Sequence, residues 1–132
     1  MKRTLIALVM CGAFGATAET PQEGATAILK LLKDRNYTDL FSQRYSEWHK
    51  VEASGKTPEE AVKKLSALWE RNYDMMVTLF EQLSKAEYKL SKSEIQQKSE
   101  TGDMATGTVS IGDKTIPYRL YKMKNGRWGF HM

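Results

Sequence analysis

The spacing of apolar residues changes along this chain at Glu87. Before it, apolar residues recur every three or four positions, the period of a helix with one buried face. After it, apolar and polar residues alternate, the period of a half-buried antiparallel strand. A block of helices followed by a block of strands predicts an α+β domain, with the N-terminal helices packed on a twisted antiparallel sheet of about four strands.

Helix starts are marked twice by the same kind of motif. Thr20-Pro21-Gln22-Glu23 and Thr57-Pro58-Glu59-Glu60 each place a capping residue before a proline and an acid. The helical spacing of the apolar residues predicts helices over residues 21–34, 38–49 and 58–85.

The second and third of these helices differ in their apolar stripes. The second is expected to bury an aromatic stripe that includes Tyr45 and Trp48, and to be followed by a loop over residues 50–56. The third has the widest stripe, to which Leu68 and Met75 contribute. We therefore expect the third helix to be the most buried of the three.

The alternating half of the chain predicts four strands and their turns. Gly112-Asp113 and Asn125-Gly126 mark turns, and the second is a strong hairpin signal. Pro117 has no N–H to donate to a neighbouring strand, so its strand is expected at a sheet edge or locally irregular. The four strands are expected over residues 87–97, 103–112, 114–123 and 127–132.

Residues 1–18 have the order of features of a secretory signal peptide. Lys2 and Arg3 precede an apolar run over residues 4–14, and small residues up to Ala18 form a cleavage site. The run is too short for a stable membrane span. Cleavage after Ala18 leaves one domain over residues 19–132, exported to the bacterial periplasm or beyond the cell.

Cys11 is the only cysteine and lies inside this leader. It could carry a lipid as in bacterial lipoproteins, but the bulky Met10 before it makes this the less favoured interpretation. The mature domain would then contain no thiol, which excludes a disulfide framework and cysteine-bound zinc. The formal net charge of +4 falls to +2 without Lys2 and Arg3, a weak argument for nucleic acid. We expect no metal and no cofactor.

Three segments of the strand half carry a resemblance to a known family. They are Ala105-Thr106-Gly107-Thr108-Val109, Tyr118-Arg119-Leu120-Tyr121-Lys122 and Lys124-Asn125-Gly126-Arg127-Trp128-Gly129-Phe130. With the order of elements, they resemble the cystatin-like cone of the nuclear-transport-factor-like superfamily, and within it small exported bacterial domains of unknown function. Members use the hollow between sheet and helices for isomerases, dehydratases, small-ligand binding or protein contacts, so the fold does not choose the function.

The favoured function is a non-enzymatic binding domain for a small apolar ligand or a partner protein. The alternatives are a cofactor-free isomerase or dehydratase that uses a Tyr or His in the hollow, and a structural homodimer with Arg119 and Tyr121 in its interface. His49, His131 and Asp74 form no acid–base pair by spacing. The pocket is expected to be lined by Tyr45, Trp48, Trp69, Tyr73, Tyr118, Leu120 and Trp128.

The last predicted hairpin gathers basic and aromatic residues. Such a cluster fits an anionic partner, such as lipid headgroups or an acidic protein patch. The favoured interpretation is a solvated hairpin whose lysines prevent edge-to-edge aggregation. The cluster consists of Arg119, Tyr121, Lys122, Lys124 and Arg127.

Overall fold

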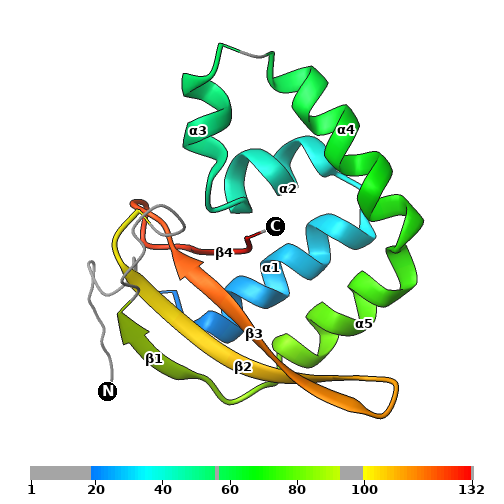
Figure 1. Cartoon of the computed structure of the whole chain (residues 1–132), viewed down its shortest axis with the longest axis vertical. Coiled ribbons are helices and arrows are strands. Elements are labelled where there is room, and N and C mark those ends of the chain that lie inside the picture. The colour runs from blue at the N-terminus through cyan, green and yellow to red at the C-terminus, as the bar shows by residue number, and fades with distance from the viewer. Residues whose placement is uncertain (1–18, 56, 93–99, 132) are drawn as a thin grey trace, which may run out of the picture.

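Five helices and an open four-stranded sheet make up the part of the chain that the structure describes (Figure 1). The structure is a computed structural model that describes residues 19–55, 57–92 and 100–131. The predicted leader, with Cys11 and Ala18, lies outside the described residues. The elements are α1 (Pro21–Lys33), α2 (Tyr37–Arg44), α3 (Trp48–Ala53), α4 (Pro58–Arg71), α5 (Tyr73–Leu83), β1 (Lys89–Lys92), β2 (Asp103–Ile111), β3 (Lys114–Lys122) and β4 (Trp128–Gly129).

The sheet is antiparallel throughout, in the order β1-β2-β3-β4. Helices α1 and α5 lie across the sheet, while α2, α3 and α4 arch away from it (Figure 1). Ala105, Val109 and Leu120 project from the sheet into the core and are buried. The α+β prediction is therefore confirmed.

Both predicted helix starts are confirmed. The Thr20 hydroxyl accepts from the Glu23 N–H at 3.1 Å, and the Glu23 carboxylate accepts from the Thr20 N–H at 2.9 Å, a complete capping box. The Thr57 hydroxyl accepts from the Glu60 N–H at the start of α4. Each cap satisfies a backbone donor that the first helical turn leaves without an intrahelical partner.

The second predicted helix, over residues 38–49, is two helices in the structure. Its path is interrupted because the C-terminal segment pairs with the backbone there. The Phe130 N–H donates to the Arg44 carbonyl and the Ser46 N–H donates to the Phe130 carbonyl, both at 2.8 Å. Tyr45 becomes extended, with a ψ of 116°, and α3 then runs into the predicted loop over 50–56. The expected boundaries here were wrong.

The third predicted helix, over residues 58–85, bends at Asn72 into α4 and α5. Asn72 has a φ of −117° and a ψ of 25°, outside the helical range. The expected wide burial was also wrong: Trp69 is the one fully buried residue of α4, and Leu68 and Met75 are 43% and 45% exposed. The bend between Leu68 and Met75 prevents one continuous stripe from facing the core.

The outer strands are shorter than expected. β1 is exposed along its whole length, with Leu90 65% exposed, and residues 93–97 of the predicted strand lie outside the described residues. β4 ends at Gly129 because Phe130 leaves β3 to pair with Tyr45. β4 pairs with β3 only at Tyr121 and Lys122. Pro117 therefore lies on an open sheet edge, as its missing N–H predicted.

The Asn125-Gly126 hairpin is confirmed as a three-residue loop. The Gly126 N–H donates to the Met123 carbonyl at 3.0 Å, and the Met123 N–H donates to the Arg127 carbonyl at 2.8 Å. Gly126 has a φ of 83°, the left-handed conformation that a bulge residue after a tight turn requires.

An aromatic cluster fills the centre of the domain. Phe130 lies against the rings of Phe41, Trp69 and Phe80, at centroid distances of 5.9, 4.8 and 6.4 Å. All four side chains are at most 2% exposed. Burying a side chain of this size contributes about 2–3 kcal/mol, so the last strand's extension into the helices is a principal stabilising contact.

Candidate binding site at the edge of the sheet

The structure brings three of the seven predicted pocket residues to the aromatic cluster. Tyr45 stacks on Phe130 at 5.7 Å, and Tyr118 meets the edge of Phe80 at 5.9 Å. Trp69 lies between Phe80 and Phe130. We expected these rings to line a ligand pocket, and in the structure they contact the rings of Phe80 and Phe130.

The other four residues lie on four different elements and belong to, or pack against, the same buried core. Trp48 and Leu120 are buried in α3 and β3. Tyr73 lies under the guanidinium of Arg35, 3.9 Å from its ring centre. Trp128 is buried and borders a second hollow, of about 340 Å³, together with Leu90 of β1. Only Tyr118 borders the hollow described next.

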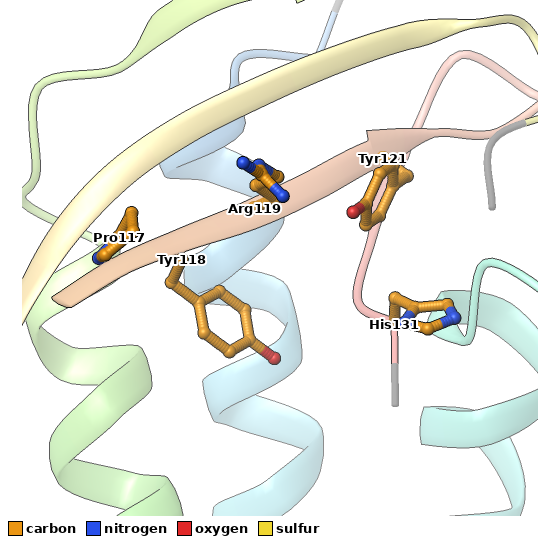
Figure 2. Close-up of a pocket in the computed structure, with 5 residues that line it drawn as sticks. All are labelled: Pro117, Tyr118, Arg119, Tyr121 and His131. Atoms are coloured by element: carbon orange, nitrogen blue, oxygen red, sulfur yellow. The ribbon is translucent and has the colours of Figure 1, made fainter. Parts of the chain in front are cut away.

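A hollow of about 200 Å³ lies on the outer edge of β3, where β4 departs from it. In Figure 2 the Tyr121 ring faces His131, and Tyr118 extends from the same strand toward the helices. The Tyr121 and His131 rings meet edge to face at 5.9 Å. The hollow is lined by Pro117, Tyr118, Arg119, Tyr121 and His131.

The hollow exists because the C-terminal segment crosses from the sheet to α2. Gly129 permits this crossing, since a Cβ there would overlap the carbonyl oxygen of Arg44 and lie 2.8 Å from the Met123 sulfur. After Gly129 the chain no longer follows β3. Pro117 and Arg119 are thus left exposed along the strand.

His131 closes one end of the hollow through an ion pair with α2–α3. Its Nε2 lies 2.9 Å from Glu47 Oε1, and Lys50 Nζ lies 2.5 Å from the other oxygen. Burial opposes ionisation of Glu47, but the Lys50 hydrogen bond and the His131 charge outweigh it and hold its pKa below the usual value. Glu47 is therefore a carboxylate already held by Lys50 and in contact with His131. We infer that it anchors His131 and does not act as a free base.

Tyr118 and Tyr121 occupy unequal environments. Burial raises the pKa of Tyr118 well above its ordinary value of 10, so its hydroxyl stays protonated at alkaline pH where an exposed tyrosine ionises. Tyr121 was expected on the exposed side with Arg119, but it is 5% exposed because His131 covers it. That expectation is corrected: the strand alternates as predicted, and the C-terminal segment buries one residue of the outer face.

The remaining candidates lie outside the hollow. His49 Nδ1 is 3.9 Å from Glu100 Oε2, and Asp74 is exposed. Within the described ranges, no three side chains of His, Cys, Asp or Glu gather as a metal site would require. In the same ranges, no helix has the length and apolar character needed to cross a membrane.

Sequence reasoning missed Arg44 and Glu19. Arg44 is 5% exposed, and its guanidinium holds both oxygens of Glu19, at 2.6 and 3.1 Å, and donates to the Trp128 carbonyl at 3.0 Å. One signal was present: Arg44 stands within the helical stripe of Phe41, Tyr45 and Trp48, where a charge needs a buried partner.

The fold and the hollow define an α+β domain whose sheet is covered on one face and open along one edge. Comparisons of the chain with protein families, curated proteins and solved structures found no match. Membership of the nuclear-transport-factor-like superfamily stays a prediction.

Proposed function

We propose that the chain is an exported, non-enzymatic binding domain that takes an extended segment of a partner protein along the open edge of β3. The observation that supports this best is the hollow of about 200 Å³ beside Tyr118 and Arg119. It lies where a strand would lie if β4 continued along β3. Exposed sheet edges bind peptides by adding a strand, with alternate side chains entering pockets.

The register gives the edge unused backbone groups. The turn at Gly112-Asp113 closes on the pair Ile111 and Lys114, and pairs that exchange hydrogen bonds alternate with pairs that do not. Thr115, Pro117 and Arg119 therefore direct their backbone groups away from β2. On the side of β3 that faces away from β2, no strand of the described residues pairs with it between Lys114 and Leu120. A docked segment would satisfy the N–H and carbonyl of Arg119.

The enzymatic alternative has weaker support. Tyr118 and His131 border the same hollow, and a protonated Tyr118 is a proton donor. An isomerase also needs a base, and the carboxylate beside His131 is Glu47, which is engaged by Lys50. We therefore rank partner binding above catalysis, and above a small apolar ligand, because the predicted interior pocket residues pack on one another.

Selection from a displayed random-peptide library against the full chain tests the proposal. Selected peptides are expected to lose at least tenfold in affinity for Arg119→Pro, which removes an outward N–H but no β2–β3 hydrogen bond. Thr108→Pro is the matched control. Thr108 lies opposite Pro117 in the register, and its N–H points away from β3, toward the other edge of the sheet.

Circular dichroism would establish that both variants keep the fold. Failure to select any binder, or equal binding to the chain and to folded Arg119→Pro, would contradict docking at this edge.

A further inference from the structure

The sheet face that turns away from the helices carries cations and no acid. The register places Lys89 beside Thr106 and Thr106 beside Arg119, a row across three strands. The one acidic residue of the four strands, Asp103, belongs to the opposite face, where it pairs with Lys92. The other residues of the open face are Ser91, Met104, Thr108, Ser110, Thr115, Pro117 and Tyr121.

Arg119 is the last residue of this row and lies on β3, at the edge of the sheet. It is exposed, and its side chain is one of those that border the hollow. In the described part of the chain, neither Arg119 nor Lys89 lies within ion-pair distance of a carboxylate. The guanidinium of Arg119, at the end of this row, is therefore available to pair with a carboxylate of another chain.

We infer that the partner's segment is acidic and places an Asp or Glu directly opposite Arg119. This inference rests on the proposed docking along β3. A strand added there would lie about 4.8 Å from β3, and its residue opposite Arg119 would project on the same face. The carboxylate would lie next to Arg119 on the added strand, in line with Lys89 and Thr106, and would pair with the guanidinium.

The residue next to that acid must suit the hollow. Neighbouring residues of a strand project on opposite faces, so the residue opposite Tyr118 would point toward the helices. Tyr118 presents its ring there, against Phe80. An apolar side chain fits this position. The partner's motif is therefore an apolar residue adjacent to an acidic one within an extended segment.

A second copy of this chain is a poor occupant. The exposed strand Lys114–Lys122 contains three cations and no acid, so two such edges would repel each other. Pro117 would also deprive each copy of one ladder hydrogen bond. Charge complementarity thus favours a different, acidic chain.

Three fluorescently labelled decapeptides with blocked ends test the inference. Each has a sequence of alternating threonine and valine, and they differ only at one central residue, which is glutamate, glutamine or lysine. Fluorescence anisotropy with the full chain is expected to show the glutamate probe binding about fivefold tighter than the glutamine probe, as for a cross-strand ion pair. The lysine probe is expected to bind most weakly. The preference should shrink in high salt.

Charge reversal at the edge gives the decisive comparison. In Arg119→Glu the order of the probes is expected to invert, whereas Arg71→Glu on the exposed end of α4 should leave it unchanged. Equal affinities for all three probes would overturn the acidic motif and leave edge docking intact. Failure of every probe to bind would overturn both. A dimer in sedimentation that Arg119→Pro dissociates would instead assign the edge to a second copy.

Discussion

Arg44 is the residue on which the two ends of the domain depend. Its guanidinium binds Glu19 just before α1 and the Trp128 carbonyl in β4. Glu19 also accepts from the Trp128 N–H at 2.9 Å. Because the side chains of Arg44 and Glu19 are 6% and 19% exposed, loss of one charge would leave the other poorly solvated.

Arg44→Met is expected to lower the free energy of unfolding by about 3 kcal/mol, since the partly buried Glu19 carboxylate would be left without a cation. Urea denaturation measures this. The control is Lys30→Met, which removes an exposed pair with Asp34 and should change stability by at most about 0.5 kcal/mol. Similar losses in the two variants would refute the role assigned to Arg44.

The path of the C-terminal segment past Arg44 also depends on Gly129, which has no side chain. Gly129→Ala is expected to cost about 2–3 kcal/mol in urea denaturation, because its Cβ would overlap backbone and the Met123 sulfur. Gly55→Ala is the comparison: its φ is +80° but nothing lies within 4 Å, so it should cost only about 1 kcal/mol of left-handed strain. A larger loss of stability for Gly55→Ala than for Gly129→Ala would contradict the close approach of the chain at Gly129 to Arg44.

At the scale of elements, the outer sides of β2 and β3 are covered to different extents. β1 covers β2 only from Asp103 to Thr106. Beyond it, Gln82 of α5 accepts from the Ser110 N–H at 2.7 Å and donates to the Ser110 carbonyl at 2.8 Å. A side chain thus takes the place of a strand at Ser110, whereas among the described residues no side chain does so for β3 between Lys114 and Leu120.

Gln82→Leu is expected to lower stability by about 1 kcal/mol, because both hydrogen bonds are lost at a site that water reaches. Hydrogen exchange of the Ser110 amide should accelerate. Glu81→Leu, at the neighbouring exposed position, is the control and should leave that amide unchanged. Unaltered Ser110 exchange in Gln82→Leu would show that Gln82 does not protect this edge.

At the scale of the whole molecule, folding keeps several tyrosines protonated. Burial raises the pKa of Tyr45, Tyr88 and Tyr118, and burial together with a hydrogen bond to Glu70 raises that of Tyr37. In the unfolded chain these groups ionise near pH 10. The unfolded state therefore loses protons first as the pH rises.

Stability is accordingly expected to be fully present below about pH 10 and to fall above it. Urea denaturation on both sides of pH 10, with phenolate absorbance of the folded protein, measures the effect. Tyr118→Phe should make the decline shallower, since it removes one of the groups whose pKa folding raises. A folded protein whose six tyrosines all titrate near pH 10 would contradict the prediction.

Local signals gave the α+β class, both capped helix starts, the Asn125-Gly126 hairpin and the edge position of Pro117. They failed where distant backbone competes with local preference: at Tyr45, where Phe130 takes the hydrogen bonds of a continuing helix, and at the ends of β4. The hollow beside Tyr118 and the ion pair of Arg44 with Glu19 arise from the same crossing.

The sequence by itself determined the α+β class, the two capped helix starts and the Asn125-Gly126 turn, because periodicity, caps and turn residues act within a few positions along the chain. Only the tertiary structure decided where the last strand leaves the sheet. That departure joins residues more than eighty positions apart, Arg44 with Trp128 and Glu19 with Trp128. Contacts between residues so far apart in the sequence form only when the helices pack on the sheet. It is this closure that leaves β3 open beside Arg119.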